Sequence, residues 1–127
     1  MEASIQLFAA IHFLIIGLSH ILAPRAWASF FNLLREKGEP GVFAVAFLSL
    51  WFGSIIVVFH NVWSGLPAVL TFIGWAQVLK ALLYFTFPAW GLRGMKMVPP
   101  ERAHLFVYAG FFALALGGLF IYQFATS

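Results

Sequence analysis

The class of this protein is decided by stretches such as residues 103–124, which read AHLFVYAGFFALALGGLFIYQF and contain no Lys, Arg, Asp or Glu. A helix needs about 20 mainly apolar residues to cross the roughly 30 Å hydrocarbon core of a bilayer. Three further apolar stretches of similar length occupy residues 4–23, 41–63 and 66–88. They are continuously apolar and do not alternate at every second residue, which excludes a membrane β-barrel. We therefore expect an all-α fold, a single domain of residues 1–127 that forms an integral membrane bundle of four transmembrane helices.

The composition excludes a soluble globular domain. Of 127 residues, 63% are hydrophobic and 9% are charged, whereas about a quarter of the residues in soluble domains are charged. Helices on the surface of a soluble domain need a polar face, and seven Lys or Arg with four Asp or Glu cannot supply one for four helices. The lipid bilayer is therefore the expected partner of most of the surface. The chain has no cysteine, which rules out disulfide bonds and thiolate metal sites.

The basic residues predict how the chain is oriented. Six of the seven lie between the first and second helices or between the third and fourth: Arg25, Arg35, Lys37, Arg93, Lys96 and Arg102. Basic residues in short loops remain on the cytoplasmic side of a membrane. We therefore expect a multi-pass membrane protein with both termini outside the cytoplasm. The net charge of +3 is explained by this orientation and does not indicate nucleic-acid binding.

The first cytoplasmic connection is expected to form a short interfacial helix. Within residues 24–35, the apolar side chains of Trp27, Phe30, Phe31 and Leu34 recur at about helical spacing. This mixture of aromatic and basic residues is typical of a helix that lies in the headgroup region.

The second cytoplasmic connection, residues 90–101, is rich in glycine and is expected to be a loop. Pro99, Pro100 and Glu101 suit the start of the fourth helix, because proline fits first-turn positions and an acidic residue favours a helix N-terminus.

A polar cluster in the cytoplasmic half of the membrane is the main candidate ligand site. Polar groups at this depth are costly and usually face the protein interior. From a rise of about 1.5 Å per residue, the cluster comprises Lys80, His20, Gln77, Tyr84, Ser49 and Tyr108. No acidic residue lies within the apolar core of any of the four stretches. Lys80 is therefore expected to extend its stem to the interface, to stay neutral, or to bind an anionic or lipid-like ligand.

The histidines at membrane depth suggest two further roles, a hydrogen bond between helices and haem ligation. His12 lies near mid-membrane and is expected to hydrogen-bond to a neighbouring helix. His20 and His104 lie at similar depth on different helices, so they are the pair that comes nearest to a haem site.

The outer end of the second helix carries His60, Asn61 and Trp63. The first two are expected to satisfy the last free carbonyl groups, and the tryptophan is expected to lie at the headgroup level. The alternative is an outer-face binding site that involves His60.

The fourth helix carries small residues at regular spacing. Ala109, Ala113 and Gly117 recur every four residues, with Gly110 beside them. Small residues at this spacing allow two helices to approach closely. They predict either packing within the bundle, or self-association and docking to a larger membrane complex.

One set of residues follows a wider pattern: His60-Asn61-Val62-Trp63, Thr71, Gly74-Trp75, Lys80 and Pro88, with Pro24-Arg25-Ala26-Trp27 after the first helix. This pattern resembles that of small, uncharacterised bacterial inner-membrane proteins of four helices. The resemblance implies an inner-membrane location and draws attention to His60, Asn61, Trp75 and Lys80, but it implies no reaction. Small multidrug transporters need a Glu within the first helix, which this chain lacks, and the Arg-rich motifs of glutathione-type membrane transferases are missing too.

The sequence contains no acid–base pair, no nucleophile with a base and no phosphate-binding loop, so we expect neither catalytic residues nor a metal site. The leading hypothesis is a non-enzymatic accessory or structural subunit that acts by helix packing, with itself or with a larger membrane complex. One alternative is a binding or transport protein for an anionic or lipid-like ligand centred on Lys80. The other is a haem-bearing electron-transfer protein, although no cofactor is expected under the leading hypothesis.

Overall fold

The computed structural model describes residues 2–96 and 102–126, which are helical almost throughout. The helices of these residues are α1 (Glu2–Leu22), α2 (Pro24–Glu36), α3 (Glu39–Phe59), α4 (Pro67–Thr86), α5 (Pro88–Met95) and α6 (His104–Thr126). No strand occurs in these two ranges. The expected all-α fold is confirmed, and the short helix expected at residues 24–35 is present as α2.

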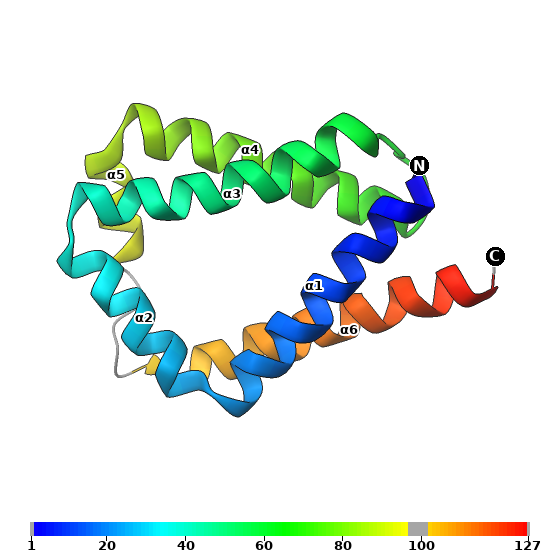
Figure 1. The fold of residues 1–127 in the computed structure, drawn as a ribbon, viewed down its shortest axis with the longest axis horizontal. Coiled ribbons are helices and arrows are strands. Elements are labelled where there is room, and N and C mark those ends of the chain that lie inside the picture. Colours follow the sequence, from blue (N-terminus) through cyan, green and yellow to red (C-terminus); the bar gives the residue numbers. More distant parts are fainter. Residues whose placement is uncertain (1, 97–101, 127) are drawn as a thin grey trace.

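Four of the helices, α1, α3, α4 and α6, are long and apolar enough to cross a bilayer, so the chain is a multi-pass membrane protein. Both termini lie at one end of the molecule, together with residues 60–66 that join α3 to α4 (Figure 1). We call this the terminal end. The short helices α2 and α5 lie at the opposite end, which we call the basic end because it carries Arg25, Arg35, Arg93 and Lys96 (Figure 1).

The helix boundaries differ most from the predicted ones at the ends of the second and third apolar stretches. α3 ends at Phe59 and not at residue 63, because His60 adopts an extended backbone with φ −146° and ψ 100°. The third apolar stretch is divided, since Phe87 leaves the helical conformation (φ −129°, ψ 69°) directly before Pro88. A residue that precedes proline disfavours the helical region, whereas proline itself suits the first turn of the new helix. The expectation of a loop was therefore wrong for residues 90–95, which belong to α5; the predicted helix start at residues 99–101 lies outside the described residues.

The long helices form two pairs, α1 with α6 and α3 with α4 (Figure 1). Each pair is held closely by glycine. A Cβ atom added at Gly17 would lie 2.9 Å from the carbonyl oxygen of Gly110, and one added at Gly53 would lie 2.8 Å from the carbonyl oxygen of Gly74. Lipid supplies no hydrophobic drive between helices, so close backbone packing of this kind is a main source of their association.

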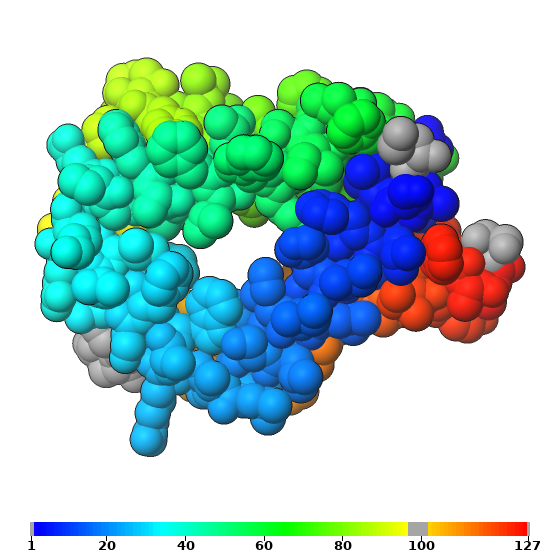
Figure 2. Space-filling view, in the orientation of Figure 1, coloured from blue at the N-terminus to red at the C-terminus, as the bar shows by residue number. Residues whose placement is uncertain are grey.

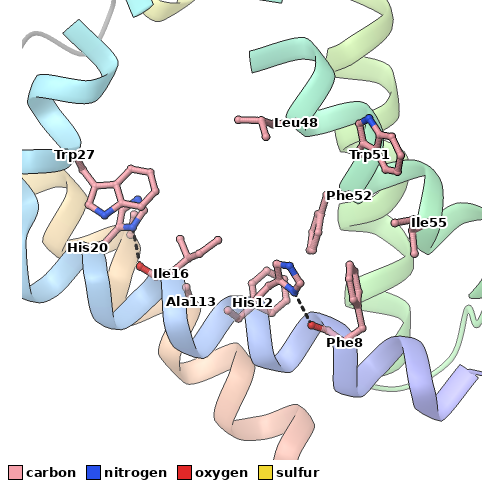
Figure 3. Close-up of a pocket in the computed structure, with 12 residues that line it drawn as sticks. Phe8, His12, Ile16, His20, Trp27, Leu48, Trp51, Phe52, Ile55 and Ala113 are labelled. Atoms are coloured by element: carbon pink, nitrogen blue, oxygen red, sulfur yellow. Dashed lines mark hydrogen bonds between the residues drawn. The ribbon is translucent and has the colours of Figure 1, made fainter. Parts of the chain in front are cut away.

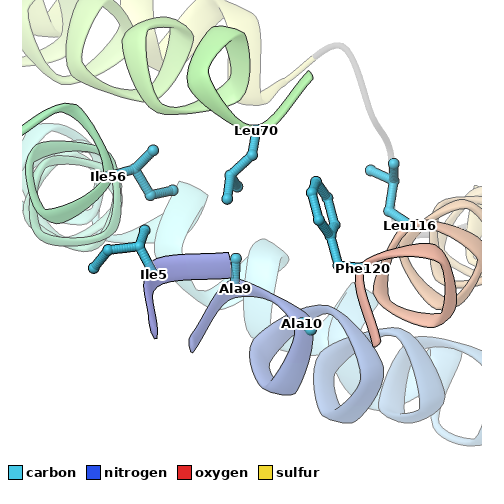
Figure 4. Packing of buried hydrophobic residues seen from close by; sticks show 7 residues of the cluster. All are labelled: Ile5, Ala9, Ala10, Ile56, Leu70, Leu116 and Phe120. Atoms are coloured by element: carbon cyan, nitrogen blue, oxygen red, sulfur yellow. The ribbon is translucent and has the colours of Figure 1, made fainter. Parts of the chain in front are cut away.

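The two pairs meet at their ends and separate between them. At the terminal end, a buried cluster from all four long helices joins them: Ile5, Ala9, Ala10, Ile56, Leu70, Leu116 and Phe120 (Figure 4). At the basic end, a smaller cluster of Val42, Val45 and Met95 packs α5 on α3. There α2 crosses from one pair to the other, and between the two ends α1 and α3 diverge (Figure 1).

Candidate functional site

A cavity of about 680 Å³ occupies the space where α1 and α3 diverge. The space-filling view shows an opening between these two helices at the middle of the molecule (Figure 2). The cavity is lined by Phe8, His12, Phe13, Ile16, His20, Trp27, Leu48, Trp51, Phe52, Ile55, Ala109 and Ala113 (Figure 3). Because the crossing helices follow the long axis of the molecule, this opening faces sideways, at the depth of the lipid hydrocarbon.

The spacing of residues along the helices determines which of them line the cavity. Phe8, His12, Ile16 and His20 follow one another at intervals of four residues on α1, and residues at this spacing share one side of a helix. α3 supplies the opposite wall, and α6 contributes two alanines whose small side chains leave room beside α1. Trp27 of α2 closes the cavity at the basic end (Figure 3).

His12 presents a hydrogen-bond acceptor to the cavity. Its Nδ1 lies 2.9 Å from the carbonyl oxygen of Phe8, and because a carbonyl oxygen only accepts, Nδ1 carries a proton. In the neutral imidazole, Nε2 then holds a lone pair. The ring contacts two aromatic neighbours, with centroids 4.4 Å from Phe8 and 5.8 Å from Phe52, and these two rings stack on each other with centroids 5.8 Å apart. The expected hydrogen bond to a neighbouring helix is absent from the described residues, since the partner belongs to α1 itself.

His20 has the same backbone anchor, and its ring is stacked on an indole. Its Nδ1 lies 2.8 Å from the carbonyl oxygen of Ile16, while its ring stacks on Trp27 with centroids 4.2 Å apart. The Trp27 indole in turn donates to the Ser19 hydroxyl at 2.8 Å. This arrangement fixes the side chain that closes the cavity at the basic end.

The lining carries no Lys, Arg, Asp or Glu. It consists of two imidazoles and two indoles, and otherwise of hydrocarbon side chains. An ionised molecule would therefore lose its hydration in this cavity without gaining a charged partner, which is strongly unfavourable.

The residues predicted around Lys80 lie apart from this cavity. Lys80, Gln77 and Tyr84 are on α4 and Ser49 is buried on α3, so these four belong to the α3–α4 pair. The Lys80 Nζ lies 5.5 Å from the centroid of the Tyr84 ring, within the range of a cation–π contact. None of the four lines the cavity, and anion binding by Lys80 stays a prediction.

The other members of that set lie on the α1–α6 pair. His20 lines the cavity, whereas Tyr108 is exposed on α6. His104 is also exposed, and its ring contacts that of Tyr108 with centroids 6.0 Å apart.

The outer-face residues form a hydrogen-bonded network at the terminal end. His60 is fully buried, and its Nδ1 lies 2.9 Å from the Thr71 hydroxyl oxygen. This hydroxyl donates to the Val62 carbonyl at 2.7 Å and accepts from the Val62 N–H at 3.2 Å. The His60 Nδ1 must therefore donate to it, which leaves Nε2 to accept from the Gln6 amide at 3.1 Å. Burial lowers the pKa of His60, in agreement with a neutral imidazole in this network.

Asn61, and Trp75 of α4, form two further hydrogen bonds beside this network. Asn61 donates to the Val57 carbonyl at 2.6 Å, and the Trp75 indole donates to the Asn61 side-chain oxygen at 3.4 Å. Trp63 is exposed. These internal bonds satisfy both ring nitrogens of His60 and the Thr71 hydroxyl, so the network fastens α1 and α4 to the end of α3.

The small residues of α6 pack mainly against α1. Gly110 and Gly117 are buried, and a Cβ at Gly110 would lie 2.6 Å from the Gly17 carbonyl oxygen. Ala113 lies against Gly17 and lines the cavity, and Ala109 lines it as well.

Reasoning from the sequence missed the aromatic half of the cavity. Phe8, Phe52 and Trp51 have no polar atom that marks them at membrane depth, apart from the indole nitrogen, and aromatic residues abound in this chain. The four-residue spacing from Phe8 to His20 was the available signal, because it places both imidazoles and two apolar side chains along one ridge of α1.

No family model, curated protein or solved structure matches the chain.

Proposed function

We propose that this membrane protein binds a small lipid-soluble molecule, taken up sideways from the bilayer into the cavity between α1 and α3. The observation that carries the proposal is the cavity itself, about 680 Å³ of space walled by aromatic and aliphatic side chains. Ligand sites typically measure about 300–1,000 Å³ and combine mainly apolar walls with a few polar groups. The opening at hydrocarbon depth (Figure 2) supports access from the lipid phase.

The volume favours a small molecule over a helix of another protein. A transmembrane helix about 10 Å wide and 30 Å long occupies roughly 2,400 Å³, more than three times the cavity volume. The buried positions of Gly110 and Gly117 also remove much of the surface on which self-association had been expected. An accessory subunit therefore receives less support than a binding protein.

The proposed binding site does not include Lys80. The cavity has no cation for an anionic group, so of the anionic or lipid-like ligands named in the alternative hypothesis it favours a neutral, lipid-like one. The same argument disfavours haem, whose propionate groups need cationic or solvated partners. His12 and His20 do have the backbone anchor that is common in metal-ligating histidines, so an absorption spectrum of the purified protein separates the two hypotheses.

We also infer that the basic end faces the cytoplasm, because short segments rich in Lys and Arg are retained there. Alkaline phosphatase, which is active only outside the cytoplasm, is expected to be active when fused after Thr126 and inactive when fused after Lys37. The reverse pattern would contradict this orientation.

The proposed function is tested by filling the cavity. Ile16 lines the cavity, whereas the neighbouring Ile15 does not. Both side chains are exposed, so neither is packed in the protein core. With 2-naphthol as the probe, we expect a raised thermal-unfolding midpoint for the wild type and for Ile15→Trp, and no shift for Ile16→Trp. A ligand at 100 times its Kd stabilises the folded state by about 2.7 kcal/mol, which is readily measured. Equal shifts in both variants, or none in the wild type, would contradict binding in this cavity.

A further inference from the structure

In the neutral imidazole of His12, Nε2 is a hydrogen-bond acceptor at the middle of the crossing helix α1. His12 is ten residues from each end of α1 (Glu2–Leu22), or roughly 15 Å at 1.5 Å per residue. Its Nδ1 is committed to the Phe8 carbonyl, so the lone pair of Nε2 is what the ring offers to the cavity. Figure 3 shows the ring rising from α1 into the space between the two helices.

No donor from the described residues reaches this nitrogen, since the only hydrogen bond of His12 is the one to Phe8. Neither of the two indoles that line the cavity donates to this nitrogen: the Trp27 indole donates to Ser19, and no hydrogen bond joins Trp51 to His12 in the part of the chain that the structure describes. Water is an unsuitable partner, because a bound water needs two to four polar groups and the walls around His12 are the rings of Phe8 and Phe52. A polar atom without a partner is costly in such surroundings, so the site is complementary to a ligand that brings a donor.

We propose that the ligand is a neutral molecule with a flat ring and a hydroxyl group, and that the hydroxyl donates a hydrogen bond to Nε2 of His12. This inference rests on the proposed function and adds the chemical class of the ligand. The absence of charged lining residues selects a neutral molecule. The stacked rings of Phe8 and Phe52, both in contact with the His12 ring, offer the edge and face contacts that aromatic groups prefer.

His20 does not share this role. One face of its ring is covered by Trp27 at 4.2 Å, and it lies two residues from the end of α1, where headgroups and water supply donors. The two imidazoles are therefore a matched pair for experiment, since both line the cavity and both have the same backbone anchor.

The experiment compares 2-naphthol with 2-methoxynaphthalene, which has the same ring but no hydroxyl. A hydrogen bond of ordinary net strength corresponds to about a fivefold difference in affinity. We expect the wild type to bind the naphthol about fivefold more tightly than the ether, at equal concentrations in the micelle. His12→Phe should remove this preference, whereas His20→Phe should keep it.

A second measurement does not depend on how well the variants fold. In wild-type protein labelled with ¹⁵N-histidine, 2-naphthol should shift the Nε2 resonance of His12, and the ether should leave it unchanged. Equal affinity for the two compounds in the wild type, or a preference lost in His20→Phe and kept in His12→Phe, would overturn the inference while leaving ligand binding intact. If neither compound binds the wild type, the proposed function and the inference fall together.

Discussion

Replacing Gly110 by leucine is expected to separate α6 from α1 and to destabilise the protein by about 3 kcal/mol, the upper part of the range for overpacking. A Cβ at this position would already lie 2.6 Å from the Gly17 carbonyl oxygen and 2.9 Å from the His20 Cβ. The first contact is with backbone, which cannot turn aside as a flexible side chain can. The change is measured as the shift in the midpoint of unfolding by SDS in mixed micelles, followed by tryptophan fluorescence.

Gly118 supplies the matched control for this substitution. It lies on the same helix, and a Cβ there would meet nothing within 4 Å, so Gly118→Leu should leave the midpoint almost unchanged. Equal destabilisation by the two substitutions would contradict this account, because the contact between α1 and α6 would then not explain the loss, and neither would helix propensity, which is higher for leucine than for glycine.

Replacing Thr71 by valine is expected to destabilise the terminal end by about 3 kcal/mol. Valine has nearly the same shape, but it removes the hydroxyl that serves His60 and both backbone groups of Val62. Each buried polar group left without a partner costs about 1–3 kcal/mol, and Thr71 and His60 are fully buried. Unfolding by SDS measures the loss.

Thr86→Val is the control, because Thr86 is exposed at the end of the same helix. It should change the midpoint by less than about 0.5 kcal/mol, as is usual for surface substitutions. A Thr71→Val variant as stable as Thr86→Val would show that the His60 network contributes little to holding α1 against α4.

The crossing helices could be predicted from the sequence because the requirement is local: a long enough apolar stretch must satisfy its own backbone hydrogen bonds in lipid. The basic residues likewise predicted that α2 and α5 share one end. The pairing of helices was harder, since it depends on which glycines meet. Gly17 and Gly110 are 93 residues apart, and neither position alone indicates its partner.

The candidate site could be predicted only in part. Polar residues at membrane depth drew attention to Lys80 and to His20, and His20 does line the cavity. The space itself arises because α1 and α3 diverge, which is a property of the whole arrangement and of no single segment. The residues around His60 illustrate the opposite case, because their conspicuous pattern is explained by internal hydrogen bonds.

The two helix pairs are attached to each other at both ends of the molecule, and this bears on ligand binding. The buried cluster and the His60 network hold α1 against α3 and α4 at the terminal end, while α2 spans the basic end. The cavity lies between these two attachments and does not require a second chain to be formed. A ligand held there is in contact with both helix pairs, so its binding should stabilise their relative position.

The most direct test of ligand binding is native mass spectrometry of the protein after gentle extraction from its own membrane, with Ile16→Trp prepared in parallel. We predict that the wild type retains one small neutral molecule that Ile16→Trp lacks. A wild-type protein that carries nothing, or that carries the same phospholipids as Ile16→Trp, would contradict the account.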